Sequence, residues 1–204
     1  MSALASPQKI HAAVENSFPP DLAKSSRSLW RIDQLGNDVY LLVLSGGKPD
    51  FLHIVEQFGW PSSDQKWETK NYAHLMERIV TGQQWQFRLR ANPVHSVKRD
   101  SSLQTQKSAK RGKLYAHVTV RQQEQWLLER GAKYGFKLQE GSFGVVQHEV
   151  RQFPRNGKPV TLGIATFEGI LEVADQNLFL SALADGIGRA KAYGCGLLTI
   201  AKVQ

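Results

Sequence analysis

The order of strand-like and helix-like segments in the second half of the chain restricts its possible folds most. Its two central strand candidates flank Asn156-Gly157, a dipeptide that is the strongest short signal for a β-hairpin. The longer of them, Val160–Val173, is expected to be broken at Gly169. The predicted order is strand, helix, strand, strand, helix, strand, which is that of a ferredoxin-like unit. The six segments are Leu114–Val120, Arg121–Tyr134, Gly144–Phe153, Val160–Val173, Asn177–Ala184 and Leu197–Ile200.

The first half of the chain repeats this order without an opening strand. A helix is expected to begin after Ser6, a good N-cap followed by Pro7, and to end before two prolines. Only five residues precede Ser6, which is too few for a full strand. The later segments are strands at Leu29–Leu35 and Val39–Ser45 around Gly36-Asn37, a helix at Phe51–Phe58 and a strand at Gln84–Ala91.

We therefore predict an α+β protein made of two tandem ferredoxin-like (RRM-like) domains, the first lacking its opening strand. The first domain is expected at residues 1–93 and the second at residues 114–204. Residues 94–113 form a polar segment that is rich in lysine and arginine, and we expect a basic linker or loop there.

The charge of the chain favours an acidic partner. Its 204 residues include 26 Lys and Arg against 18 Asp and Glu, a net charge of +8. Nucleic acid is the first candidate, and an anionic membrane surface is the second. The chain has neither an apolar run of about 18 residues nor a signal-peptide pattern, so we expect a cytoplasmic protein that does not enter a membrane. Cys195 is the single cysteine, and no HxH or HxxxH spacing occurs, so we expect no metal and no cofactor.

Residues 186–196, with the sequence GIGRAKAYGCG, combine four glycines with two cations. We call them the glycine-rich segment. Consecutive backbone N–H groups and cations both favour phosphate, so this segment suits a polyanion. Its spacing matches neither GxxxxGK[ST] nor GxGxxG, which excludes a nucleotide P-loop and a dinucleotide site. The alternative is a helix end and a tight turn that need glycine. The glycines are Gly186, Gly188, Gly194 and Gly196, and the cations are Arg189 and Lys191.

Four stretches of the sequence resemble the CasE family, the CRISPR repeat-processing endoribonucleases of type I-E systems. The resemblance implies two tandem ferredoxin-like domains and a subunit of the Cascade complex. It also implies metal-independent cleavage of the repeat RNA at the 3′ base of its stem-loop, a 2′,3′-cyclic phosphate product and retention of the mature crRNA. The stretches are SPQKIHAAV at Ser6–Val14, FRLRANP at Phe87–Pro93, FEGIL at Phe167–Leu171 and GIGRAKAYGCGLLTIA from Gly186 onward.

His11 is the candidate catalytic residue. Cleavage by the RNA 2′-OH needs proton transfer, and a histidine serves near neutral pH because its ordinary pKa is about 6.5. A single histidine at the edge of a helix is more often packed or solvated, but the resemblance implies that His11 is the general base or acid. Several relatives carry Tyr three residues earlier, where this chain has Gln8, which cannot ionise.

Basic residues in four places are candidates for RNA binding. Two share one face of the Gln84–Ala91 strand, where the alternative is a solvated polar face. Others lie in residues 94–113, around the Asn156-Gly157 turn, where they suit the distorted base of an RNA stem, and on the glycine-rich segment. The candidates are Arg88, Arg90, Lys98, Arg99, Lys110, Arg111, Arg151, Arg155, Lys158, Arg189 and Lys191.

Two other functions remain open on the sequence. The first is a non-catalytic subunit that holds the RNA hairpin within the same complex, which the missing strand and Gln8 favour. The second is an unrelated RNA-binding protein with RRM-like sheets. Such sheets carry aromatic RNP motifs, and the chain contains no K/R-G-F/Y-G/A-F-V pattern.

Overall fold

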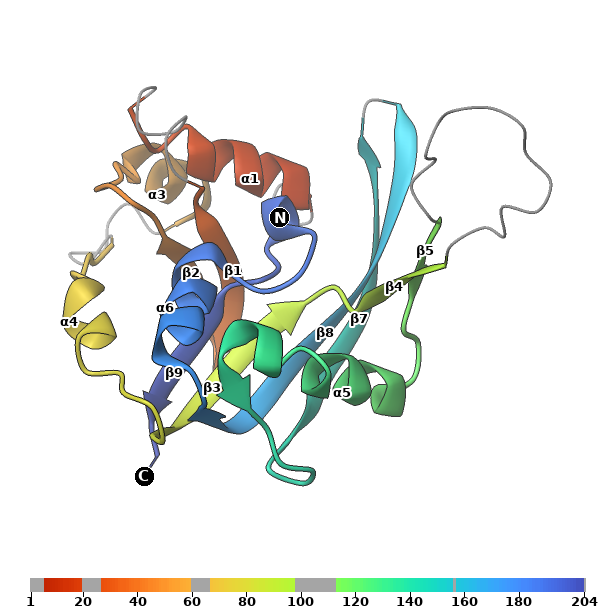
Figure 1. The fold of residues 1–204 in the computed structure, drawn as a ribbon. Helices are drawn as coiled ribbons and strands as arrows, with labels where there is room; N and C mark the ends of the chain where they lie inside the picture. The colour runs from red at the N-terminus through yellow and green to blue at the C-terminus, as the bar shows by residue number, and fades with distance from the viewer. Residues whose placement is uncertain (1–5, 20–26, 60–66, 98–112, 156, 204) are drawn as a thin grey trace, which may run out of the picture.

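The computed structural model describes residues 6–19, 27–59, 67–97, 113–155 and 157–203. Within these ranges the chain forms helices and antiparallel strands (Figure 1). The α+β class predicted from the sequence is confirmed. The α-helices are α1 (Pro7–Glu15), α3 (Leu52–Phe58), α4 (Ala73–Met76), α5 (Val120–Leu128) and α6 (Gln176–Asp185), and the 3-10 helices are η1 (Ala132–Tyr134) and η2 (Lys191–Tyr193). The strands are β1 (Leu29–Leu35), β2 (Asp38–Leu44), β3 (Gln84–Ala91), β4 (Val94–Val97), β5 (Lys113–Ala116), β6 (Phe136–Lys137), β7 (Phe143–Arg155), β8 (Lys158–Val173) and β9 (Leu198–Lys202).

The main sheet has the strand order β6-β8-β3-β9, and β7 pairs with β8. Strand β3 is central, because it pairs with both β8 and β9. Its alternating pattern places Trp85, Phe87 and Leu89 in the core, where they join Trp126 of α5 and Phe179 of α6. Helices α5 and α6 thus cover one face of this sheet (Figure 1).

The position of β3 corrects one part of the sequence-based assignment. The sequence placed this strand in the first half and expected Leu114–Val120 to open the second half. In the structure β3 lies inside the sheet of the second half, while the run from Leu114 ends at Ala116 in β5 and pairs with β4 outside that sheet. Alternation identifies the two faces of a strand but not its partners, which here lie far along the chain.

From β3 onward the main elements follow the order β-α-β-β-α-β, as β3, α5, β7, β8, α6 and β9. This is the order of one ferredoxin-like unit, with β3 as its first strand. A second such unit before β3 stays a prediction. The predicted basic linker is a loop only in part, since its two ends form β4 and the start of β5, and residues 98–112 lie outside the described residues.

The first half forms helix α1, the β1–β2 hairpin and helix α3, as the sequence predicts. Pro7 occupies the first helical position of α1 after Ser6, and Ile10 and Val14 are buried. They form a small core with Phe18 and Trp30, the latter from β1. This core is what fixes α1, and with it His11, against the hairpin.

A buried arginine attaches the β1–β2 hairpin to the main sheet. The side chain of Arg31 is 2% exposed, and its Nε and Nη2 atoms each donate a hydrogen bond of 2.8 Å to the carboxylate of Asp33. Its Nη1 donates to the carbonyls of Arg88 and Leu197 at 2.9 and 3.0 Å, and Nη2 also donates to Thr199 Oγ1 at 2.8 Å. All five N–H groups of the guanidinium are therefore used, and they join β1 to the segments of β3 and β9.

Strands β7 and β8 make a long hairpin whose register runs from Phe143–Gly169 to Arg155–Lys158. The expected break of β8 at Gly169 is wrong, because β8 continues through it and the irregularity lies in β7, between Val145 and Gln147. Glycine is required at 169 all the same, since a Cβ there would lie 2.3 Å from the carbonyl oxygen of Ser142.

Candidate functional site

His11 lies on α1 with its imidazole partly exposed. Its Nδ1 is 3.9 Å from Oε1 of Glu15, one turn further along the helix, and has no hydrogen-bond partner among the described residues. Burial lowers the pKa of His11 below its ordinary value of 6.5; Glu15 raises this pKa and Arg27 lowers it. The lowered pKa favours the neutral form of the ring, in which one nitrogen can accept a proton.

Two cations lie on the side of the molecule that α1 occupies. Helix η2 packs against α1 and brings Lys191 of the glycine-rich segment to this side of the molecule. The pKa of Lys191 is lowered by its burial and then by Arg27, the same residue that acts on His11. Arg27 is thus close enough to influence both groups. The sequence analysis did not find Arg27, because no periodic pattern or motif surrounds it.

The glycine-rich segment is held by hydrogen bonds within the chain. The N–H groups of Ile187, Gly188 and Gly196 donate to Gly196 O, Tyr134 Oη and Arg90 O, at 2.8, 3.2 and 2.7 Å respectively. The sequence predicts that backbone N–H groups of this segment bind phosphate, but these three N–H groups are already used within the chain. The cations of the segment are the exposed Arg189 and the partly buried Lys191, whose Nζ donates a hydrogen bond to the carbonyl of Asp185.

The four glycines of the segment allow close packing against the first half. Each has a positive φ, from +74° at Gly186 to +92° at Gly196. A Cβ on Gly186 would lie 2.8 Å from the side chain of Leu29, and one on Gly194 would lie 2.6 Å from the indole of Trp30. The glycine-rich segment thus positions η2 under α1. This is a structural use of glycine, of the kind that the sequence offered as the alternative to phosphate binding.

The tip of the β7–β8 hairpin approaches the same place. The ring of Phe153 lies 4.9 Å from that of Tyr193 in η2, and the guanidinium of Arg155 lies 6.0 Å above the Tyr193 ring. Arg155 and Lys158 are exposed and occupy paired positions at the tip. The structure therefore gathers His11, two neighbouring cations and a basic hairpin tip around η2.

The other predicted basic residues have different surroundings. Arg88 forms ion pairs with Asp33, at 3.3 Å, and with Glu168, and Arg90 pairs with Glu149. Arg151 also pairs with Glu149, at 2.9 Å. These three charges are already partnered within the protein. Lys98, Arg99, Lys110 and Arg111 lie outside the described residues.

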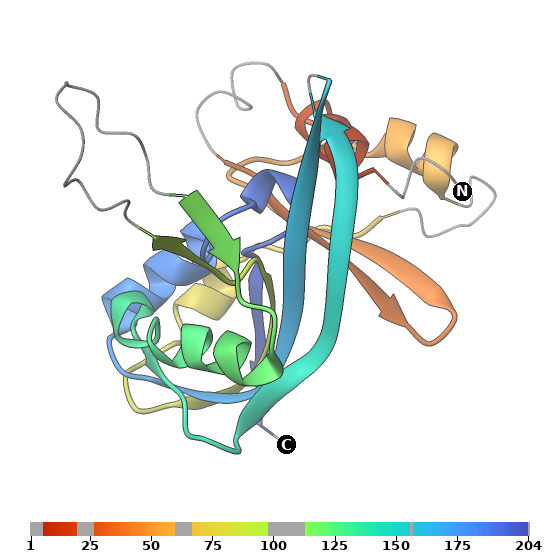
Figure 2. The same cartoon turned by 90° about the vertical axis from the view of Figure 1, so that its right-hand side faces the viewer.

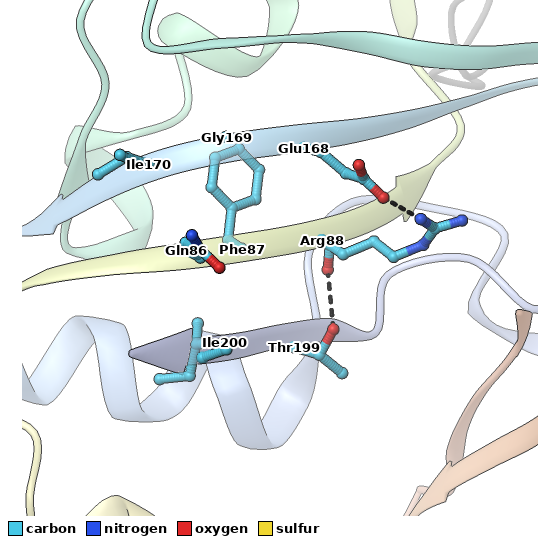
Figure 3. Close-up of a pocket in the computed structure, with 9 residues that line it drawn as sticks. Gln86, Phe87, Arg88, Glu168, Gly169, Ile170, Thr199 and Ile200 are labelled. Atoms are coloured by element: carbon cyan, nitrogen blue, oxygen red, sulfur yellow. Dashed lines mark hydrogen bonds and ion pairs between the residues drawn. The ribbon is translucent and has the colours of Figure 1, made fainter. Parts of the chain in front are cut away.

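A shallow pocket lies on the sheet face that Gln86 and Arg88 share, and Figure 3 shows its lining. Its charged groups bind each other, since Arg88 pairs with Glu168. Thr199 Oγ1 donates to the carbonyl of Arg88 at 3.3 Å. The pocket therefore offers fewer unpaired polar groups than the region around His11.

The described residues contain no group of three or more His, Cys, Asp or Glu side chains placed to hold a metal ion. Within the same ranges, no helix is long and apolar enough to cross a membrane. Cys195 is fully buried, and burial raises the pKa of its thiol to about 12, so it is an inert packed side chain.

A protein-family model described as "CRISPR associated protein" matches residues 1–202. The chain belongs to this family. The resemblance to the CasE branch that the sequence predicts is confirmed by relatives that align over almost the full chain. The CRISPR-associated endoribonuclease Cse3 of Thermus thermophilus is 29% identical over 97% of this chain and 91% of its own.

A second relative and a solved structure agree with this assignment. The CRISPR system Cascade subunit CasE of Escherichia coli is 24% identical, over 92% of this chain and 96% of its own. The structure of Thermus thermophilus Cse3 bound to an RNA representing a pre-cleavage complex superposes with a TM-score of 0.73 at 27% identity. That superposition covers 98% of this chain and 91% of the other.

Proposed function

We propose that this chain is a metal-independent endoribonuclease that cleaves CRISPR repeat RNA at the 3′ base of its stem-loop. It then stays bound to the mature crRNA as a Cascade subunit in the cytoplasm. The observation that carries this proposal is the partly exposed His11, whose pKa Arg27 lowers, on a helix that packs against η2 with its Lys191. The names of the relatives, an endoribonuclease and a Cascade subunit, support it.

The proposed reaction uses the nucleophile that RNA itself carries. The 2′-oxygen attacks the adjacent phosphorus while the bond from phosphorus to the 5′-oxygen breaks, which leaves a 2′,3′-cyclic phosphate. The 2′-OH loses a proton and the leaving 5′-oxygen gains one. His11 makes one of these transfers, as general base or general acid, and a positioned group of this kind contributes roughly 10²–10⁴-fold to the rate. Gln8 lies one helical turn before His11 and cannot ionise, so it does not make the other transfer.

Cations stabilise the charge that builds up on the phosphate during this step. Arg27 is placed to act there because it is close enough to lower the pKa of His11, and Lys191 because η2 packs against α1. The exposed Arg155 and Lys158 at the hairpin tip, together with Arg189, are placed to hold the flanking RNA backbone. Because the major groove of A-form RNA is narrow, these contacts read mainly phosphates and shape.

The remaining predicted RNA contacts involve arginines that already have carboxylate partners and basic residues outside the described ranges. Arg88, Arg90 and Arg151 take part in RNA binding only if the phosphate competes with their carboxylate partners. Lys98, Arg99, Lys110 and Arg111 are proposed on sequence alone. We also propose that the chain keeps the tandem ferredoxin-like arrangement, with β3 to β9 as the second unit.

A cleavage assay tests the proposal. The purified chain is incubated with its repeat hairpin in excess EDTA, beside His11→Ala and the control His74→Ala, an exposed histidine on α4. We expect the wild type and His74→Ala to cut at the 3′ base of the stem and leave a cyclic phosphate. His11→Ala should bind the hairpin with unchanged affinity and cut it at least 100-fold more slowly.

The alternative is a non-catalytic subunit that binds the RNA hairpin in the same complex, which Gln8 favours. It predicts tight binding of the hairpin by the wild type with no product. Cutting by His11→Ala at the wild-type rate contradicts the assigned role of His11 while leaving the endoribonuclease activity intact.

A further inference from the structure

Three rings form a cluster on the β4–β5 hairpin, outside the region around His11. His95 of β4 is paired directly with Tyr115 of β5, and their rings stack at 5.9 Å with planes 25° apart. The ring of His117, just after β5, lies 4.7 Å from that of His95. Because side chains alternate along a strand, Tyr115 and His117 share one face of the hairpin, and we call these three residues the ring platform.

The ring platform is open to solvent and carries a cation at one end. His95 is exposed, Tyr115 is 44% exposed, and both line a shallow pocket with Val118 and Thr119. Lys113, on the same face, holds its Nζ 5.3 Å from the centre of the Tyr115 ring. None of the three rings belongs to the buried core clusters of the described residues, so packing does not account for them.

The platform stands next to the long hairpin that the proposed function places on RNA. A Cβ on Gly163 of β8 would lie 3.3 Å from Cβ of Ala116, and Asn92 donates to the carbonyl of Gly163 at 2.7 Å. Figure 2 shows β4 and β5 beside the rising β7–β8 hairpin. An RNA held along that hairpin therefore passes close to the rings.

We propose that the ring platform binds an unpaired nucleobase of the RNA, by stacking on Tyr115 and His95. This inference rests on the proposed function, because it takes RNA as the ligand. Exposed rings with a lysine beside them are what single-stranded RNA requires, since bases stack on ring faces and the cation meets the neighbouring phosphate. Paired bases of a stem are already stacked on each other, so the ligand is a nucleotide outside the stem.

A metal ion fits the platform less well. Its three residues offer two imidazoles and no carboxylate, and the described residues contain no metal-binding group of three or more His, Cys, Asp or Glu. Burial, followed by the nearby His95 and Arg130, lowers the pKa of His117, which keeps that ring uncharged at neutral pH. A neutral ring can stack on a base without the cost of desolvating a charge.

Two RNA probes test the inference separately from the proposed function. The first is an unstructured hexaribonucleotide that contains one 2-aminopurine, whose fluorescence falls when the base stacks. The second is the repeat hairpin without unpaired ends. The variants are Tyr115→Leu, the conservative Tyr115→Phe, and Tyr40→Leu as a matched control. Tyr40 is 46% exposed on β2 of the other two-stranded sheet that the structure describes, and it takes no part in the ring platform.

We expect the wild type, Tyr115→Phe and Tyr40→Leu to quench the hexamer equally. Tyr115→Leu should bind the hexamer about tenfold more weakly, with the quenching lost, and should bind the blunt hairpin as the wild type does. Unchanged quenching in Tyr115→Leu overturns the inference, even if the wild type cuts the hairpin. An equal loss with Tyr40→Leu also overturns it. Quenching that needs Tyr115 in a chain that neither binds nor cuts the hairpin supports the platform and contradicts the proposed function.

Discussion

Gly194 lies against the indole of Trp30, so closely that a Cβ added to Gly194 would be 2.6 Å from ring carbon Cζ3. Trp30 belongs to the small core beneath α1, and Gly194 directly follows η2. This contact therefore sets how near the glycine-rich segment comes to the helix that carries His11.

Replacing Gly194 by alanine should destabilise the protein. The φ of +76° disfavours any side chain, at a cost of about 1–2 kcal/mol, and the clash with Trp30 adds about 1–3 kcal/mol. Urea unfolding measures the loss. Gly141→Ala is the control, because Gly141 has a φ of +82° but no atom within 4 Å of the added Cβ. Equal stability of the two variants would show that the contact with Trp30 does not contribute to the free energy of unfolding.

The pH dependence of cleavage should report the surroundings of His11. Burial lowers the pKa of His11, so the midpoint assigned to it should lie below 6.5. Glu15 raises this pKa and Arg27 lowers it, so Glu15→Gln should move the midpoint to lower pH and Arg27→Gln to higher pH. Single-turnover rates between about pH 4.5 and 8.5 measure the shifts, a range of about two units on each side of 6.5. Shifts in the same direction for both variants would contradict the assignment to His11.

Replacing Arg31 by methionine should cost about 3–5 kcal/mol in the free energy of unfolding, since it removes both hydrogen bonds to the buried carboxylate of Asp33 and leaves it only the 3.3 Å ion pair with Arg88. The control is Lys70→Met, because the Lys70–Glu68 pair is 81% and 70% exposed and should contribute less than about 1 kcal/mol. Urea unfolding compares the two. The double variant Arg31→Met, Asp33→Leu should recover part of the loss, and failure to recover any would point to the bonds with the main sheet instead.

The salt dependence of hairpin binding should identify the cations that meet phosphate. Arg155→Gln and Lys158→Gln, at the exposed tip, should each weaken binding and reduce the salt slope by about one. Lys137→Gln, on the exposed side of β6, should change neither quantity. Filter binding across a range of KCl concentrations measures the slopes. A slope unchanged in both tip variants would remove the hairpin tip from the RNA interface.

Local signals predicted much of the fold. The Gly36-Asn37 and Asn156-Gly157 pairs located the β1–β2 and β7–β8 hairpins, and Ser6 with Pro7 located the start of α1. Each depends on residues that are neighbours in the sequence, so a pattern of a few letters carries the information. The partners of β3 are set by pairing across the chain, which no local pattern encodes.

The same limit applies to the candidate site. His11 was found because its surroundings resemble a known family, whereas Arg27 has no pattern around it. Arg88 and Arg90 were placed on the correct face, but the sequence does not indicate that Glu168 and Glu149 lie opposite them. Arg31 occupies a buried position where alternation predicts an apolar residue, and its five hydrogen bonds involve groups up to 168 positions away.

The central place of β3 has a consequence for how the protein is made. Thr199 of β9 bonds the carbonyl of Arg88 in β3 across 111 positions, so the main sheet closes only when β9 has left the ribosome. Helix η2 precedes β9, so Lys191 reaches its place against α1 late in the assembly of the sheet. Pairing over such separations is slow, because a long loop must be ordered before its contacts form. A nascent chain therefore carries His11 without the cation from η2 until η2 and β9 have been made.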